Sequence, residues 1–387
     1  MTLSIKRLAV RNYRALADVS ITLDPLNVLF GPNGAGKSTL LDAIWFVHEC
    51  AERGVDVASS ARSHGIGARW MGAEPDANIE ITLDIELVTY TVSFGYSAGR
   101  IDPFVGEILR KADNTELIRR AMGSDQATFD VLDGEERMMV PLREPEKLAF
   151  TRYLDMDLRT TPAAFELNRV LKQTRRYLCR EAALDGLRKR GSEISPSFTL
   201  LSRAQNLWSV LQNIMGRQAI DDRFETILNF MRRAYPSFTN IVIETTAPGT
   251  VYASYQDSRF ADPIPALGMS DGQLQLLLLL TALFSDNENT KIVIFDEPEI
   301  SLHPHALTVF AEAVKLATTQ WNKQVLIATH SPVLISQFAP ENILAMEVND
   351  QGRTVIKRLT EIEGIGDLLE QYAAGSLYMA QVIGKQA

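Results

Sequence analysis

The chain has 387 residues, of which 46% are hydrophobic and 22% are charged, and this composition excludes a disordered or fibrous protein. Its length exceeds one average domain and allows a sizeable core, in one large lobe or in two closely packed lobes. The formal net charge of -9 excludes a basic surface over the whole molecule, although it allows a local basic face.

Nothing in the sequence points to secretion or to a membrane. The first residues, MTLSIKR, lack the apolar stretch of a signal peptide. The longest apolar run, 274–284, is shorter than the roughly 20 residues that a membrane span needs. The two cysteines, Cys50 and Cys179, are too few for a cysteine metal cluster and fit a reducing compartment. We therefore expect a cytoplasmic protein that does not bind membranes.

The first part of the chain is rich in predicted strands. Alternating or continuous apolar runs predict strands at residues 4–10, 19–23, 26–30, 78–86 and 90–94. A glycine-rich segment follows the third run directly, and the apolar spacing after it predicts a helix that ends near Gly54. This part of the chain therefore has the order strand, loop, helix, followed by further strands.

The residue pattern from about 144 to 235 predicts mostly helices, and predicted strands resume after it. Apolar runs predict these later strands at 240–245, 251–255, 292–295, 325–328, 343–348 and 354–359. A leucine-rich helix, 274–284, lies between them, and we expect its leucines to form core. We divide the chain into a first lobe, an inserted mostly helical lobe, a second lobe and a helical tail, at residues 1–105, 106–238, 239–360 and 361–387.

The segment GPNGAGKST, residues 31–39, matches the pattern G-x-x-x-x-G-K-[ST] between a strand and a helix. Its glycines let backbone N–H groups wrap phosphates, and the helix N-terminus adds a favourable dipole. Lys37 is expected to reach the β- and γ-phosphates of ATP, and Ser38 to hold Mg²⁺. The candidate nucleotide-binding residues of this loop are Asn33, Gly34, Ala35, Gly36, Lys37, Ser38 and Thr39.

Two later apolar strands end in residues suited to hydrolysis. Asp296 and Glu297 follow the strand 292–295, where Asp296 can join the Mg²⁺ shell and Glu297 can polarise an attacking water. His330 follows the strand 325–328 and can touch the γ-phosphate or hold the water. A histidine after a strand can also be structural, but its position after the two acids favours a role in the site.

The segment MSDGQ, residues 269–273, precedes the leucine-rich helix and resembles a second phosphate-binding nest. Ser270, Gly272 and Gln273 are its candidate binding residues. One chain does not need two nests for one phosphate. We therefore expect this segment to serve the nucleotide of a partner copy, which predicts a homodimer or higher homo-oligomer that closes around ATP.

These motifs in this order resemble the Walker A, signature, Walker B and switch-histidine motifs of ABC-type ATPases. The long interval between Walker A and signature looks like that of the SMC, RecF and OLD group. The strings VRNYRAL at 10–16 and EPEISLHP at 297–304 are similar to small stand-alone "AAA family" ATPases of bacteria and archaea, including those of anti-phage systems. The resemblance implies an α/β ABC-ATPase head that hydrolyses ATP, with a P-loop core sheet, an antiparallel β subdomain and an inserted helical lobe.

The sequence also departs from its relatives. MSDGQ replaces the transporter signature and SLHP replaces the usual D-loop, which argues against a transport ATPase. Gln126 is the nearest but a poor candidate for the Q-loop glutamine, which stays unassigned. Arg14 matches an arginine that approaches nucleotide in related heads, although a strand-edge arginine can equally be solvated. The insert is too short for a long coiled coil, and the stretch after Pro332 is too short for the TOPRIM nuclease domain of OLD proteins.

A basic stretch in the predicted helical lobe can track the phosphates of DNA or RNA, dock an acidic partner, or form a solvated helix face. Its members are Arg169, Lys172, Arg175, Arg176, Arg180, Arg188, Lys189 and Arg190. One hypothesis is a motor or clamp that acts on nucleic acid, as in repair. The other is an ATP-dependent switch or scaffold for a protein effector, such as a nuclease or toxin, as the defence relatives imply. The acidic overall charge and the lack of long arms favour the switch.

Overall fold

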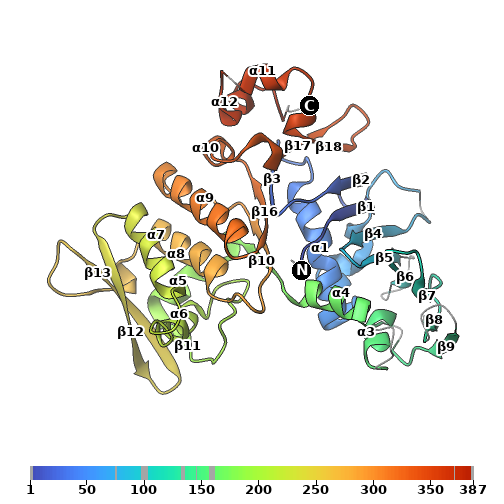
Figure 1. Cartoon of the computed structure of the whole chain (residues 1–387), viewed down its shortest axis with the longest axis horizontal. Coiled ribbons are helices and arrows are strands. Elements are labelled where there is room, and N and C mark those ends of the chain that lie inside the picture. The colour runs from blue at the N-terminus through green and yellow to red at the C-terminus, as the bar shows by residue number, and fades with distance from the viewer. Residues whose placement is uncertain are drawn as a thin grey trace.

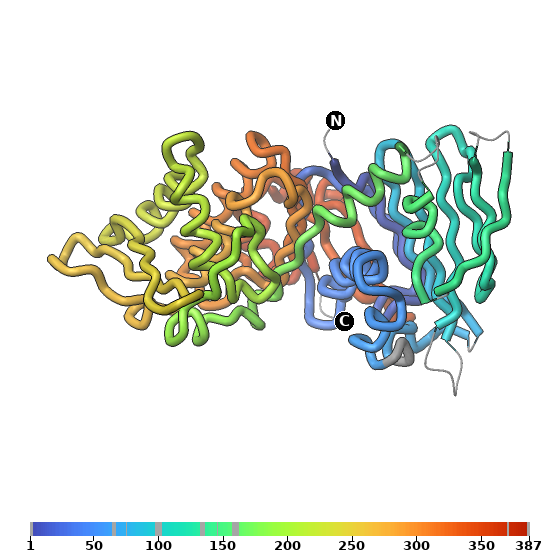
Figure 2. The backbone as a smooth tube through the Cα atoms, turned by 90° about the horizontal axis from the view of Figure 1, so that it is seen from below, coloured from blue at the N-terminus to red at the C-terminus, as the bar shows by residue number. Residues whose placement is uncertain are grey.

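The computed structural model describes residues 3–74, 76–96, 103–131, 136–144, 146–156, 162–369 and 371–384. The molecule is elongated, with one lobe rich in β strands at one end, a mixed helical and β lobe at the other, and a central sheet between them (Figures 1 and 2). This arrangement confirms the expected α/β fold with a P-loop core sheet, an antiparallel subdomain and an inserted lobe.

The central sheet has six strands in the order β10-β15-β16-β3-β17-β18. The first five are parallel, and the last is antiparallel to its neighbour. Their bounds are β10 (Thr174–Leu178), β15 (Ile292–Asp296), β16 (Gln324–Thr329), β3 (Leu26–Phe30), β17 (Ile343–Val348) and β18 (Thr354–Arg358). Strand β10 lies in a segment whose sequence predicts mostly helix. Two of its five residues are arginines, and they hide the apolar pattern of a strand.

An eight-stranded antiparallel sheet forms the first lobe, in the order β2-β1-β4-β5-β6-β7-β8-β9. Its strands are β1 (Arg7–Tyr13), β2 (Leu16–Thr22), β4 (Ile79–Asp84), β5 (Val88–Gly95), β6 (Phe104–Lys111), β7 (Glu116–Arg120), β8 (Gln126–Asp130) and β9 (Arg137–Pro141). The helices on this side are α1 (Lys37–Arg53), α2 (Val55–Ser60), η1 (Ser63–Ala68), α3 (Ala149–Leu154) and α4 (Pro162–Lys172).

Strands β6 to β9 correct the predicted boundary at residue 106, because the segment expected to open a helical lobe continues the antiparallel sheet to residue 141. A buried charge hides the strand pattern of β6. Glu107 is 1% exposed, and its carboxylate accepts hydrogen bonds from the Tyr90 hydroxyl and from the backbone N–H groups of Ala149 and Phe150. These bonds satisfy a carboxylate in a position where the strand pattern calls for an apolar residue.

The second lobe combines helices with a small sheet in which β13 pairs with β11, β12 and β14. Its strands are β11 (Ser192–Glu193), β12 (Phe238–Ala247), β13 (Thr250–Asp257) and β14 (Ile264–Pro265). Its helices are η2 (Cys179–Glu181), α5 (Leu184–Arg190), α6 (Leu207–Met215), α7 (Arg223–Ala234), η3 (Ala266–Gly268), α8 (Asp271–Phe284) and α9 (Pro304–Thr319).

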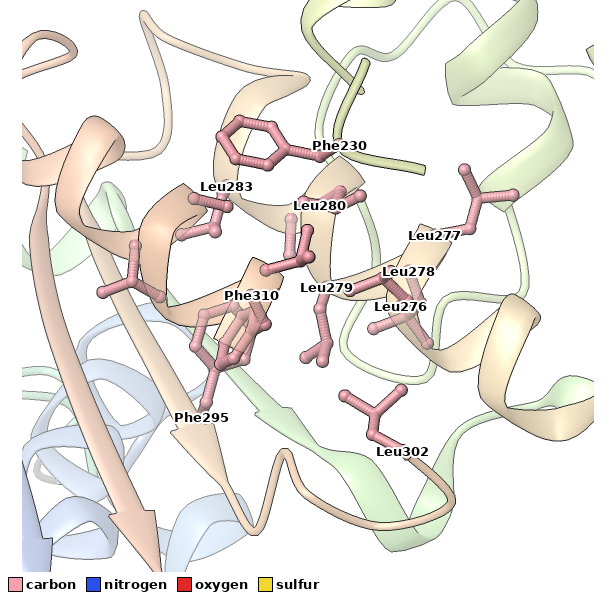
Figure 3. Close-up of a cluster of buried hydrophobic side chains, with 14 of the residues drawn as sticks. Phe230, Leu276, Leu277, Leu278, Leu279, Leu280, Leu283, Phe295, Leu302 and Phe310 are labelled. Carbon is pink, nitrogen blue, oxygen red and sulfur yellow. The ribbon is translucent and has the colours of Figure 1, made fainter. Parts of the chain in front are cut away.

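Each face of the central sheet packs against a different core. On β15, Val293 and Phe295 join the cluster of the second lobe, whereas Ile292 and Ile294 join the cluster of the first lobe. The residues that alternate along a strand point to opposite faces, so a strand covered on both sides is apolar throughout. Figure 3 shows Phe295 beside Phe310 of α9, with the leucines of α8 around them; the two rings meet edge to face at 5.5 Å. The buried leucines of α8 confirm their predicted role as core.

The end of the chain folds back on the central sheet. It contains α10 (Pro332–Ile335), η4 (Pro340–Asn342), η5 (Leu359–Glu361), α11 (Ile365–Leu369) and α12 (Ala374–Met379). Tyr378 packs edge to face on Phe30 at 5.3 Å, and its hydroxyl donates to the Gly31 carbonyl at 3.2 Å. This part of the chain therefore contacts the start of the glycine loop.

Within the described ranges, α1 is the longest helix, with 17 residues, so no long coiled coil extends from them. No helix in these ranges has the length and apolar character needed to cross a membrane.

Candidate functional site

The glycine loop lies between the carboxyl end of β3 and the start of α1. Gly34 and Gly36 adopt positive φ angles of 83° and 94°, which side chains other than glycine rarely tolerate. A Cβ atom at Gly31 would lie 2.1 Å from the Met346 carbonyl oxygen on β17, so this strand can pass the loop only because residue 31 is glycine. The resulting turn leaves the loop wrapped ahead of the N-terminus of α1, where backbone N–H groups lack helical partners.

Lys37 is buried under this loop. Its Nζ donates to the carbonyl oxygens of Gly31 at 2.8 Å and Pro32 at 3.0 Å. Burial lowers the pKa of Lys37 to about 8, although the negative charges of Glu297 and Asp296 oppose this shift. The ammonium group is thus held at the base of the loop by weak backbone acceptors, from which a phosphate can recruit it.

A cavity of about 350 Å³ opens beside the loop, at the edge where the parallel strands β3, β10, β15 and β16 end. Its lining consists of Ala15, Asn33, Gly34, Gly36, Lys37, Ser38, Thr39, Arg180, Glu297 and His330. Ligands bind at this edge in open α/β sheets. The structure thus brings most of the predicted loop residues together with Glu297 and His330. Ala35 is fully buried behind the loop.

Ser38 and Asp296 form the pair expected to hold Mg²⁺. The Ser38 hydroxyl donates to Asp296 Oδ1 at 2.8 Å, across from α1 to the end of β15. No group of three or more His, Cys, Asp or Glu side chains in the described ranges is suited to a metal ion. One hydroxyl and one carboxylate fit Mg²⁺, which keeps waters and takes further ligands from substrate phosphates.

Arg176 of β10 binds Asp296 and holds it in place, a role that the sequence did not predict. Its guanidinium donates to Asp296 Oδ2 at 3.2 Å and to Asp42 Oδ1 at 2.6 Å. Asp42 on α1 also accepts from Arg62 at 2.8 Å. Burial raises the pKa of Asp42, but the charges of Arg62 and Arg176 and the hydrogen bonds outweigh it and lower the pKa to about 2. Because Arg176 is only 8% exposed, it cannot belong to the predicted basic face.

Arg14 joins the same network from the turn between β1 and β2. It adopts a positive φ of 49°, and its guanidinium donates to Asp42 Oδ2 at 3.0 Å. It is absent from the cavity lining in the described part of the chain, although its neighbour Ala15 belongs to it. Contact between Arg14 and nucleotide stays a prediction.

Glu297 stands at a strained turn directly after β15. Its φ is 55°, in the left-handed region, and its backbone N–H donates to the Ala328 carbonyl at 2.8 Å. The carboxylate is bound by Arg180, with Arg180 Nε 2.7 Å from Glu297 Oε2 and Nη2 in contact with both oxygens. The turn therefore aims a negatively charged side chain into the cavity.

His330 closes the opposite side of the cavity. Its backbone N–H donates to Glu299 Oε1 at 2.7 Å, and its Nδ1 lies 3.5 Å from Lys37 Nζ. Burial lowers the pKa of His330, and the charge of Lys37 lowers it further. The imidazole is therefore neutral at physiological pH and offers one donor and one acceptor.

The signature segment forms the N-terminus of α8. The Ser270 hydroxyl accepts from the Gln273 N–H at 3.2 Å, and the Gln273 side chain accepts from the Ser270 N–H at 2.9 Å, which is a capping box. Gly272 lies close to the segment after β15, since a Cβ atom there would be 2.7 Å from the Ser301 carbonyl oxygen. In the described residues, the cavity lining contains none of Ser270, Gly272 or Gln273.

The rest of the predicted basic stretch is divided between different surroundings. Arg188 pairs with Asp271 and donates to the Met269 carbonyl at 3.1 Å, and so braces the signature segment. Lys189 pairs with Asp185 on its own helix, and Arg175 donates to backbone carbonyls. Helix α4 lies with the first lobe and α5 with the second (Figure 1). The predicted basic residues are therefore divided between elements of both lobes.

The chain matches the protein family described as "AAA domain, putative AbiEii toxin, Type IV TA system" over residues 26–336. It is 25% identical over 368 residues to the OLD nuclease of Thermus scotoductus, covering 92% of this chain and 64% of that protein. It is 39% identical over 61 residues to the DNA replication and repair protein RecF of Bacteroides thetaiotaomicron, covering 16% of each. The chain thus spans less than two thirds of these curated relatives.

Among solved structures, the chain resembles the Smc head bound to the C-winged helix domain of ScpA. The TM-score is 0.52 at 14% sequence identity, over 91% of this chain and 96% of that one. At this identity the likeness concerns the fold, which is that of an SMC-type head.

Proposed function

Since this chain belongs to the AAA-domain family, within the SMC, RecF and OLD branch of ABC-type ATPases, we propose that it binds and hydrolyses ATP as a closing dimer. One observation supports the proposal most strongly. The cavity gathers the glycine loop with Glu297 and His330, whereas the signature segment of the same chain supplies no residue to the described lining.

In the proposed reaction, the N–H groups of the glycine loop and Lys37 bind the phosphates of ATP. Ser38 and Asp296 would hold Mg²⁺, which would supply positive charge to neutralise the phosphates. Glu297 accepts a hydrogen bond from the attacking water and polarises it. Neutral His330 orients the same water or donates to the γ-phosphate.

The signature segment completes the site of a second copy. Ser270 is exposed at the N-terminus of α8, where a helix favours a bound anion, and its hydroxyl is small enough to approach a phosphate. A partner's nucleotide would cover this exposed end. ATP therefore acts as the ligand that joins two copies, and hydrolysis releases them.

The Glu297→Gln variant tests this proposal. Its amide keeps the size of the side chain but cannot polarise water, so ATP should bind, turnover should be lost and the closed dimer should accumulate. Light scattering with ATP measures the mass. A control with Lys37→Ala in addition should stay monomeric. An unchanged mass in every nucleotide state of Glu297→Gln, with no larger assembly already present, would contradict dimer closure.

We further propose that the closed dimer is a switch or scaffold for a protein effector, in anti-phage defence. The description of the family as a putative toxin and the likeness to an OLD nuclease support an effector of that kind. The net charge of -9 and the division of the basic residues between two lobes argue against a nucleic-acid clamp.

Affinity purification from the native host, with identification of bound protein and nucleic acid, tests this role. The expected result is a protein partner whose binding depends on ATP. Tight binding of duplex DNA at physiological salt, with no protein partner, would instead favour a repair or chromosome-maintenance ATPase.

A further inference from the structure

Arg180 occupies a position at the cavity that none of the sequence motifs explains. Strand β10 pairs with β15 in parallel, with Leu178 opposite Asp296. Because both strands end here, the residues that follow them lie side by side, and Arg180 reaches the carboxylate of Glu297. The guanidinium binds both carboxylate oxygens, which is the two-pronged geometry that arginine favours. Each acid of the Walker B motif thus has its own arginine, Arg176 from β10 for Asp296 and Arg180 from η2, directly after β10, for Glu297.

Arg176 in β10 and Arg180 in η2 differ in how firmly they are held. Arg176 is buried between two carboxylates, and its side chain is 9% exposed. The Arg180 side chain is 70% exposed, and its hydrogen-bond partner in the described ranges is Glu297. Exposed ion pairs are weak because water solvates both charges and the side chain loses freedom. Arg176 is therefore a fixed support, whereas Arg180 can exchange its partner.

ATP would bring into the cavity a stronger hydrogen-bond acceptor for Arg180 than Glu297. Arg180 lines the cavity together with Lys37, Ser38 and His330, the residues proposed to surround the terminal phosphate. A γ-phosphate carries more negative charge than one carboxylate and accepts the same two-pronged hydrogen bonds. ADP lacks this group and offers no such competition.

We propose that Arg180 is a sensor of the γ-phosphate, which binds Glu297 when no γ-phosphate is present and moves onto the γ-phosphate when ATP binds. The exchange has two consequences. The carboxylate of Glu297 becomes free to polarise water only when there is a phosphate to attack, and the guanidinium then stabilises the charge of the transition state. This inference rests on the proposed ATPase function of the same cavity.

The test compares the binding of AMP-PNP and of ADP, both with Mg²⁺, by calorimetry. In Arg180→Ala, the affinity for AMP-PNP should fall on the order of tenfold, the value of a lost charged hydrogen bond, while ADP binding stays within about twofold. Arg180→Lys should recover part of the AMP-PNP affinity, since it restores the charge without the planar fork. Binding of ADP by each variant shows that the fold and the loop are intact.

Single-turnover hydrolysis at saturating ATP gives the second measurement. The rate should fall in Arg180→Ala, because the transition state loses a cation. A matched control is Arg203→Ala, which removes another exposed arginine that pairs with a neighbouring acid, Glu181, and lies outside the cavity lining. This control should match the wild type in both measurements.

Three outcomes would overturn the inference. Arg180→Ala could keep the wild-type preference for AMP-PNP over ADP, or it could lose affinity for both nucleotides equally. It could also hydrolyse ATP faster than the wild type, which would mean that Arg180 only inhibits hydrolysis. A failure of the proposed function is distinguishable from these, because in that case the wild type itself would not bind or hydrolyse ATP.

Discussion

The glycine loop and the signature segment both present a helix N-terminus, yet their surroundings differ. The glycine loop faces a cavity that its own chain furnishes with a lysine, an acid and a histidine. At the signature segment, Ser270 and Asp271 are exposed, and the hydrogen bonds of the segment serve its own helix cap and its contact with Arg188. The comparison teaches that, under the proposed function, the chain carries one nearly complete phosphate site and one fragment of a second site.

The largest expected effect comes from Lys37→Ala, which removes the cation of the complete site. Nucleotide affinity should fall on the order of a thousandfold, because the lysine makes charged hydrogen bonds to more than one phosphate oxygen. Titration with a fluorescent nucleotide measures this loss. Lys189→Ala, in an exposed pair on α5, should bind like the wild type. Wild-type affinity in Lys37→Ala would refute the assignment of the loop.

Arg176→Ala, compared with Arg188→Ala, tests how firmly an arginine anchors each of the two segments. Removal of Arg176 takes the buried arginine away from Asp296 and one of three arginines away from Asp42, which keeps Arg62 and Arg14, and should cost about 3 kcal/mol of stability. The matched change on the signature side, Arg188→Ala, breaks a pair with an exposed acid and should cost about 1 kcal/mol. Urea unfolding of both variants measures the difference. Equal losses would mean that both segments are anchored alike.

The same network predicts a loss of stability in acid. The pKa of Asp42 falls from 3.8 to about 2 on folding, so the ionised carboxylate stabilises the folded state. A depressed carboxyl pKa contributes stability that is present above pH 4 and lost as the pH falls toward 2. In Arg176→Ala the loss should begin at a higher pH, because one of the cations that favour ionisation is gone while Arg62 remains. Urea midpoints between pH 5 and 2 measure this, and identical pH curves would contradict it.

Gly272→Ala acts on the incomplete site alone. The added methyl group would lie 2.7 Å from the Ser301 carbonyl oxygen and 3.1 Å from the Tyr235 hydroxyl, so the segment must shift. Turnover and ATP-dependent dimerisation should fall about tenfold, since a misplaced stabilising group weakens the transition state. Nucleotide affinity of the monomer should stay unchanged. A parallel loss of nucleotide affinity would show that the segment serves its own chain's cavity.

The smallest effect is expected from the exposed basic residues outside both sites. The triple variant Lys172→Glu, Lys189→Glu and Arg190→Glu should keep ATP turnover within about twofold, because these side chains lie away from the cavity. The variant should also leave duplex DNA binding unchanged, as we expect little binding in the wild type. Tight salt-dependent binding by the wild type that this variant loses would revive the nucleic-acid interface.

The sequence predicted the fold class and the family, because the loop, the two acids and the histidine follow apolar strands in a recognisable order. It did not predict β10 or the strands β6 to β9. Their buried charged residues, such as Glu107 and Arg176, interrupt the apolar pattern, and the partners that satisfy them come from distant parts of the chain. The role proposed for Arg180 was equally hidden, since only the pairing of β10 with β15 brings it to Glu297. The assigned functions of the site residues stay predictions.

Strand β10 is also where the chain crosses from the first lobe to the second (Figure 2). Its five residues pair with β15 in one register, and a slip of one residue would turn Arg176 away from Asp296. The lobes are therefore not free to slide past each other along this strand. The register of the crossing strand is thus tied to Asp296 through Arg176, so a partner that displaced the second lobe along β10 would also disturb the edge of the sheet where the Walker B acids lie.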